Sequence, residues 1–91
     1  MRIIWSDEAL DDLKRLVEFL APVSVKAADR TADLLLGGPE KLLVTPRLGE
    51  RVSRPGPEEV RRIIFEDCEL RYEVQPDVVV VLRIWYTREN R

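Results

Sequence analysis

The segment Val78–Arg88, which reads VVVVLRIWYTR, constrains the fold of this chain more than any other feature. A run of β-branched apolar residues of this length is typical of a strand that is buried on at least one face. The run then gives way to Arg83, Trp85 and Tyr86. A buried strand that carries a guanidinium, an indole and a phenol toward its end also presents a polar and aromatic surface. We therefore look for function at that end of the strand.

Size and charge limit the classes of protein that fit. The chain has 91 residues, enough for one core of two layers, and we interpret residues 1–91 as a single domain. Its net charge is −2, with 15 basic and 17 acidic residues. Domains that bind nucleic acid through bulk charge are clearly basic. Any site for an anion or for RNA must therefore be a local cluster of cations.

The cysteine and histidine content excludes several kinds of chemistry. Cys68 is the single cysteine, and histidine is absent. The common zinc sites and the Ser-His or Cys-His nucleophile pairs cannot be built from this set. We expect no metal and no cofactor. A lone cysteine indicates a reducing compartment, and no apolar run reaches the length of a membrane span, so the sequence predicts a cytoplasmic protein without membrane contact.

The N-terminal half predicts a strand followed by a helical hairpin. The short apolar run Arg2–Trp5 predicts an edge or pairing strand, and Ser6 is placed to cap the first helix. In that helix Asp12 is expected to fall off the apolar stripe. Ser24 is placed to cap the second helix. The segment Gly37–Pro39 should break it, because glycine loses backbone entropy and proline removes a donor.

The C-terminal half predicts a long loop and then three antiparallel strands. The loop is Thr45–Glu59, and the strands are Val60–Glu66, Glu69–Gln75 and Val78–Thr87. The fold class is therefore α+β, with a helical hairpin packed on one face of a sheet that contains a three-strand meander. The positions expected on the helix side are Leu70, Tyr72, Val74, Val80, Leu82 and Ile84. Those expected on the outer face are Glu69, Arg71, Glu73, Arg83 and Trp85.

Short motifs in this order resemble the RelE/ParE family of small toxins from bacterial type II toxin–antitoxin modules. The matching segments, in chain order, are Ala9-Leu10-Asp11-Asp12-Leu13, Ala27-Ala28, Pro46–Arg51, Val60–Ile64, Tyr72-Glu73-Val74 and the closing LRIW-x-x-R. Each motif alone is weak, but their order and spacing cover nearly the whole chain.

The resemblance implies one of two activities. RelE-like members cut mRNA at the ribosome, whereas ParE-like members inhibit DNA gyrase. RelE-like proteins usually carry a Tyr-Arg pair where this chain has Cys68 and Glu69, and nuclease-like members often end the last strand with Trp-His, where this chain has Trp85 and Tyr86. Both departures favour the ParE-like interpretation. We expect a toxin that inhibits DNA gyrase and that a cognate antitoxin neutralises.

Two alternatives remain open at this point. In the first, the chain is a ribosome-dependent mRNA endonuclease, with Arg83, Tyr86 and Arg88 as the catalytic groups. Cleavage needs a proton donor and cations for the phosphate, and a nearby carboxylate such as Glu69 would repel that phosphate. In the second, the chain is an inactive member that only binds antitoxin.

The residues that we expect to contact the target or the antitoxin are cationic or aromatic. They are Arg47, Arg51, Arg62, Arg71, Arg83, Trp85, Tyr86 and Arg88, and Arg54 in the loop extends the same group. Trp85 and Tyr86 should lie on opposite faces of one strand. In the free protein we expect Arg83 to form a cross-strand ion pair with Glu69 or Glu73.

Overall fold

The computed structural model describes residues 1–65 and 67–88, and it has the expected α+β order of elements. The elements are β1 (Arg2–Trp5), α1 (Asp7–Leu20), α2 (Val25–Gly37), a 3-10 turn (Gly38–Glu40), α3 (Lys41–Val44), β2 (Glu50–Arg51), β3 (Glu59–Phe65), β4 (Cys68–Val74) and β5 (Val78–Tyr86). The predicted end of one strand at Glu66 lies outside the described residues. The stretch predicted as an uninterrupted loop contains the two-residue strand β2, which is a correction.

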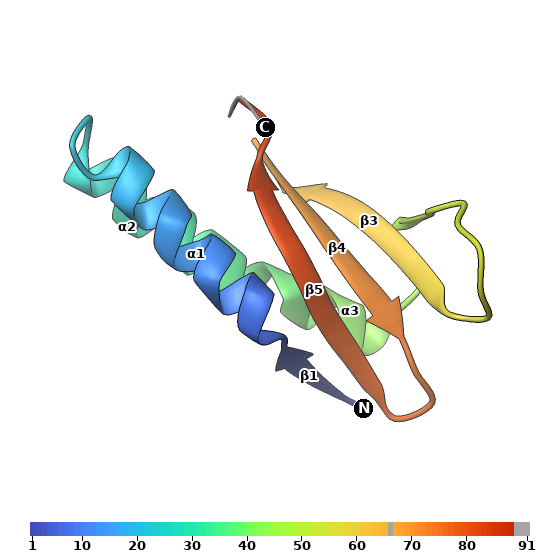
Figure 1. Ribbon diagram of the computed structural model, residues 1–91. Helices are drawn as coiled ribbons and strands as arrows, with labels where there is room; N and C mark the ends of the chain where they lie inside the picture. Colours follow the sequence, from blue (N-terminus) through green and yellow to red (C-terminus); the bar gives the residue numbers. More distant parts are fainter. Residues whose placement is uncertain (66, 89–91) are drawn as a thin grey trace.

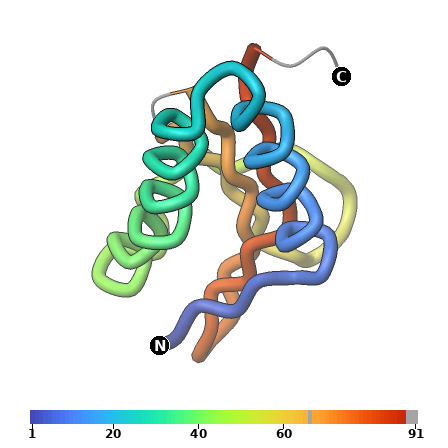
Figure 2. The backbone as a smooth tube through the Cα atoms, turned by 90° about the vertical axis from the view of Figure 1, so that its left-hand side faces the viewer, coloured from blue at the N-terminus to red at the C-terminus, as the bar shows by residue number. Residues whose placement is uncertain are grey.

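One five-stranded sheet runs in the order β1-β5-β4-β3-β2 (Figure 1). β1 is parallel to β5, and the other neighbours are antiparallel, so β3, β4 and β5 form the predicted meander. The two long helices lie side by side along one face of the sheet, as Figure 2 shows in blue and teal. Among the helices of the described residues, none has the length and apolar character needed to cross a membrane.

Serine caps begin both long helices, as predicted. The Ser6 hydroxyl accepts a hydrogen bond from the Ala9 N–H at 3.0 Å, and the Ser24 hydroxyl accepts one from the Ala27 N–H at 3.1 Å. Each satisfies a donor that has no partner within its own helix. The predicted break is also confirmed, because α2 ends at Gly37 and a short 3-10 turn follows.

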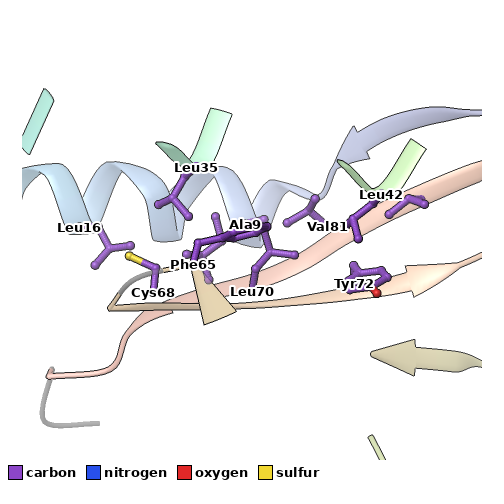
Figure 3. Close-up of a cluster of buried hydrophobic side chains, with 11 residues drawn as sticks. Ala9, Leu16, Leu35, Leu42, Phe65, Cys68, Leu70, Tyr72 and Val81 are labelled. Carbon is purple, nitrogen blue, oxygen red and sulfur yellow. The ribbon is translucent and has the colours of Figure 1, made fainter. Parts of the chain in front are cut away.

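The core lies between the helical hairpin and the sheet (Figure 3). Leu16 of α1 and Leu35 of α2 are fully buried against side chains from β4 and β5. Cys68 is also buried. The remaining members of this cluster are Ala9, Leu42, Phe65, Leu70, Tyr72, Val79, Val81 and Ile84.

A bulge at Leu82 interrupts the pairing of β5 with β4. Arg83 pairs with Arg71, whereas Val81 already pairs with the next residue of β4, Tyr72. One strand therefore carries an extra residue at this point. A bulge of this kind reverses the alternation of side chains beyond it.

The prediction that Val80 and Leu82 face the helices is wrong for this reason. The fully buried residues of β5 are Val79, Val81 and Ile84. Before the bulge the odd-numbered residues Val79 and Val81 face the helices. The extra residue shifts the alternation by one, so the even-numbered Ile84 faces the helices beyond it. The predicted positions in β4 and beyond the bulge need no correction.

The first helix closes the edge of β5 that β1 leaves open. β1 pairs only with residues 78–81 of β5. Beyond that point the Ser6 N–H donates to the Val81 carbonyl at 2.9 Å, and the Ser6 hydroxyl donates to the Leu82 carbonyl at 2.9 Å. The Ile84 N–H donates to the Asp12 carboxylate at 2.9 Å. The backbone of the last strand is thus satisfied by the start of α1.

The phenol of Tyr72 fixes the start of the loop that follows α3. Its hydroxyl donates to the Pro46 carbonyl at 2.8 Å and accepts from the Gly49 N–H at 2.8 Å. Arg61 adds a hydrogen bond to the Gly49 carbonyl, also at 2.8 Å. Burial raises the pKa of the Tyr72 phenol, so it keeps the proton that it donates.

Replacing Tyr72 with phenylalanine should lower the free energy of unfolding by about 1–3 kcal/mol. The ring would still fill the core, but the Gly49 N–H and the Pro46 carbonyl would lose their buried partner. Urea denaturation followed by circular dichroism measures this change. An unchanged midpoint would show that the two hydrogen bonds do not hold the loop.

Candidate functional site

The outer face of the sheet, away from the helices, carries half of the eight predicted contact residues. Glu69 of β4 lies on this face and joins two arginines. Its Oε1 lies 3.6 Å from Arg62 Nη1, and its Oε2 lies 3.2 Å from Arg71 Nε. The β-ladder produces this arrangement, because Arg62 and Arg71 are direct partners across β3 and β4. The sheet therefore brings Arg62, Arg71 and Glu69 together.

Arg83 does not pair with Glu69 or Glu73, so that expectation is corrected. Its Nε donates to Asp12 Oδ2 at 2.8 Å, and its Nη2 donates to Asp12 Oδ1 at 3.2 Å. The acceptor comes from α1, which lies along the edge of β5 next to the bulge. Bidentate pairing of this kind fixes both the position and the plane of a guanidinium.

Asp12 is buried, which corrects the expectation that it falls off the apolar stripe of α1. Burial by itself raises the pKa of its carboxyl. The hydrogen bonds from Arg83 and from the Ile84 N–H, with the charges of Arg83 and Arg15, outweigh burial and leave this pKa below its ordinary value. Asp12 is therefore an anion at neutral pH.

The indole of Trp85 lies under two guanidinia. The Arg71 guanidinium carbon is 4.9 Å from the centre of the ring, and that of Arg83 is 5.5 Å away. Both distances are within the range of a cation–π interaction. Glu69 holds Arg71, and Asp12 holds Arg83. The side chains of Arg71, Trp85 and Arg83 therefore form a row with fixed orientation.

The two carboxylates that hold these arginines, Glu69 and Asp12, are buried, whereas the guanidinia are exposed. The side chains of Arg62, Arg71 and Arg83 are 41%, 38% and 46% exposed, whereas those of Glu69 and Asp12 are 8% and 6% exposed. Around Arg71 and Arg83 solvent therefore meets guanidinia, although the chain as a whole is acidic; beside Arg62 it also meets the exposed carboxylate of Glu50. The expected repulsion from Glu69 is reduced, because that carboxylate lies beneath two arginines.

A hollow of about 390 Å³ opens beside this row. Its lining includes Arg71, Arg83 and Trp85 of the sheet and Arg54 from the loop between β2 and β3. The apolar part of the lining comes from Val52, Val60 and Leu82. The hollow thus combines three guanidinia with an apolar floor. We refer to it as the outer hollow.

The loop arginines do not form one patch. Arg47 donates to the Glu59 carboxylate at 2.9 Å, and Arg61 donates to the same carboxylate at 2.7 Å. The hydrogen bond from Arg61 is the main cause that holds the pKa of Glu59 below its ordinary value, and the hydrogen bond from Arg47 adds to it. Arg51 and Arg54, by contrast, line a second hollow of about 310 Å³. The predicted group of loop cations is thereby divided.

Tyr86 lies on the helix side, opposite to Trp85, as predicted. Its ring centre is 6.1 Å from that of Phe19 in α1. It lines a cavity of about 350 Å³ with residues of both helices and Cys68. Arg88 pairs with Asp67 at 3.5 Å. The sheet therefore separates Tyr86 from Arg83, and the three proposed nuclease groups do not converge on one site.

Sequence reasoning missed the role of Asp12. The signal was present, because Asp12 follows Ala9 by three positions and precedes Leu16 by four, and both of these are buried. That spacing places Asp12 on the core side of the helix. A carboxylate on an apolar stripe needs hydrogen-bond donors, and the Arg83 guanidinium and the Ile84 N–H are those donors.

Comparison with known proteins gives consistent matches. Residues 3–91 match the family model described as ParE toxin of type II toxin-antitoxin system, parDE. Toxin RelE3 of Caulobacter vibrioides is 36% identical over 80 residues, which is 88% of this chain and 87% of that protein. A solved structure described as the chromosomal ParDE TA system from P. aeruginosa superposes with a TM-score of 0.76 over 97% of each chain. Its sequence identity is 18%, so this last match concerns the fold alone.

Proposed function

Because the chain belongs to the RelE/ParE family of toxins from type II toxin–antitoxin systems, we propose that it arrests growth by inhibiting DNA gyrase. The toxin acts by binding, and the outer face of the sheet is the surface that meets the target. A cognate antitoxin neutralises it. The proposal takes the ParE-like branch of the family, whose model matches almost the whole chain.

One observation carries this choice. Arg83 and Tyr86, two of the groups that a nuclease mechanism would use, lie on opposite faces of β5. General acid catalysis requires the proton donor to lie within hydrogen-bond reach of the leaving oxygen, and the phosphate cation must lie at the same place. Arg88 pairs with Asp67, which lines the cavity beside Tyr86. The exposed guanidinia beside Trp85 are suited to binding rather than to proton transfer.

The surface that we assign to the antitoxin is the cavity beside Tyr86. Leu20 and Ala27 contribute apolar lining, and Lys26 and Arg30 contribute positive charge. The nearby Phe19 is about half exposed. An antitoxin segment with apolar anchors and acidic flanks fits this combination, and a helix laid in an apolar groove is a common mode of such recognition.

The second candidate function is ribosome-dependent cleavage of mRNA. It is favoured by the relative named Toxin RelE3, which is 36% identical to this chain. Primer extension on translated mRNA tests it directly. New cut sites that disappear when Arg83→Ala and Tyr86→Phe are combined would support the nuclease and oppose the gyrase proposal. Absence of growth arrest on expression without antitoxin would instead indicate an inactive member.

The gyrase proposal predicts a dose-dependent loss of supercoiling when purified toxin is added to gyrase. Replacing Arg71 and Arg83 together with glutamine should raise the toxin concentration needed for half-inhibition by about tenfold or more, since buried or stacked arginines are frequent hot spots. Arg2→Gln is the matched control, because it removes an exposed guanidinium on β1. Intact supercoiling at saturating wild-type toxin would contradict the proposal.

A further inference from the structure

One edge of the Arg83 guanidinium is hydrogen-bonded to Asp12, and the other edge remains available for a second acceptor. Asp12 accepts from Nε and Nη2 of its guanidinium. A guanidinium carries five N–H groups, and its Nη1 end can bind a second oxyanion in the same plane. Within residues 1–65 and 67–88, that Nη1 donates no hydrogen bond, and the side chain is about half exposed. The pair with Asp12 therefore orients an anion-binding edge.

Arg83 also lines the outer hollow, together with two further arginines and several apolar side chains. Arg54 and Arg71 line it with Arg83, and Val52 and Leu82 supply apolar surface. A carboxylate would find three arginines in the lining, and an aliphatic side chain next to it would find apolar surface to contact. This combination suits an acidic segment of protein that also carries an apolar side chain.

We infer that the outer hollow binds an acidic, apolar-anchored segment of the toxin's protein target, and that Asp12 is the positioning residue that holds Arg83 for this contact. The identity of the target as gyrase rests on the proposed function. The chemistry of the hollow does not, because it follows from the cations and the apolar floor. Asp12 touches the partner only through Arg83.

Two features favour a protein segment over a nucleic-acid strand. A single strand is bound by stacking its bases on aromatic rings, and here the ring of Trp85 already carries the guanidinia of Arg71 and Arg83. Binding to phosphates also scales with the number of cations, whereas this chain has a net charge of −2. A short acidic segment needs only the local group of cations.

The test is a titration of the ¹⁵N-labelled chain with a synthetic peptide of alternating Glu and Leu, followed by NMR at low salt. The Arg83 and Arg71 Nε–H signals and the Trp85 indole N–H signal should shift. The signals of α2 should stay in place. Arg83→Gln should weaken the fitted affinity by about tenfold, and Asp12→Asn by about threefold, since the amide still accepts the Ile84 N–H but no longer attracts the guanidinium.

Controls separate positioning from general stability. Arg2→Gln removes the same charge away from the hollow and should leave the affinity unchanged. The folded spectrum of each variant is recorded before titration, so a loss of binding is measured on folded protein. An oligothymidylate with the same number of charges should bind more weakly than the peptide.

Three results would overturn the inference. They are no shift at Arg83 or Trp85, equal affinity for the wild type and for both Arg83→Gln and Asp12→Asn, and tighter binding of the oligothymidylate at the same signals. Gyrase inhibition is measured separately. A chain that binds the peptide in the hollow but leaves supercoiling intact would refute the proposed target and retain this inference.

Discussion

Replacing Gly49 with alanine is expected to lower the free energy of unfolding by about 3 kcal/mol. A Cβ at this position would lie 2.5 Å from the Arg62 carbonyl oxygen and 2.7 Å from the Tyr72 hydroxyl. Neither neighbour moves easily, because Arg62 belongs to the paired strand β3 and Tyr72 is fully buried. The added methyl group would push the loop away from the phenol and weaken the Gly49 hydrogen bond.

Gly37→Ala is the matched control for this change. Gly37 ends α2 with a helical backbone, and a Cβ there would meet nothing within 4 Å. Alanine should therefore raise the free energy of unfolding by up to about 1 kcal/mol, because it restricts the unfolded chain and favours the helix. Thermal and urea denaturation of both variants measure the contrast. Similar effects at the two glycines would show that the close approach at Gly49 is not the cause.

Replacing Asp12 with asparagine is expected to lower the free energy of unfolding at pH 7 by about 2 kcal/mol. The amide oxygen can still accept the Ile84 N–H, but it carries no charge for Arg83. The loss should be smaller than that for a fully buried ion pair, because the Arg83 side chain is about half exposed. Urea denaturation of the two proteins measures the difference.

The effect of Asp12→Asn should vanish in acid. The folded pKa of Asp12 lies below its ordinary value of 3.8. Its contribution is therefore fully present above about pH 3.8 and is lost as the pH falls through the folded pKa. Asp11→Asn removes an exposed carboxylate next to it on α1 and serves as control. A difference between wild type and Asp12→Asn that persists unchanged in strong acid would contradict an ionised Asp12 as its source.

Local signals predicted the helices and most of the sheet. Ser6 and Ser24 are short polar residues before apolar-periodic segments, and the Gly37–Pro39 stretch is a strong breaker, so helix ends could be read from the sequence. The alternation in β4 identified Leu70 and Tyr72 as core residues. These features depend on neighbours in the chain, and local rules describe such neighbours well.

The bulge and the partner of Arg83 could not be predicted in the same way. In the run from Val78 to Leu82 every residue is apolar, so no alternation marks the position at which the phase changes. The pairing of Arg83 with Asp12 joins residues 71 positions apart. It depends on how α1 lies along β5. The sequence therefore pointed to the nearer carboxylates Glu69 and Glu73 as partners of Arg83, whereas the partner is Asp12.

The closure of β5 by β1 and then by α1 has a consequence for how this chain can exchange strands. Domain swapping and fibril growth start from free backbone groups at a strand edge. Along β5, the Val81 and Leu82 carbonyls and the Ile84 N–H are taken by Ser6 and Asp12 of the same molecule. A second chain cannot add a strand there without first detaching the helix. Any added strand must therefore align with β1, or with β3 beyond the short β2.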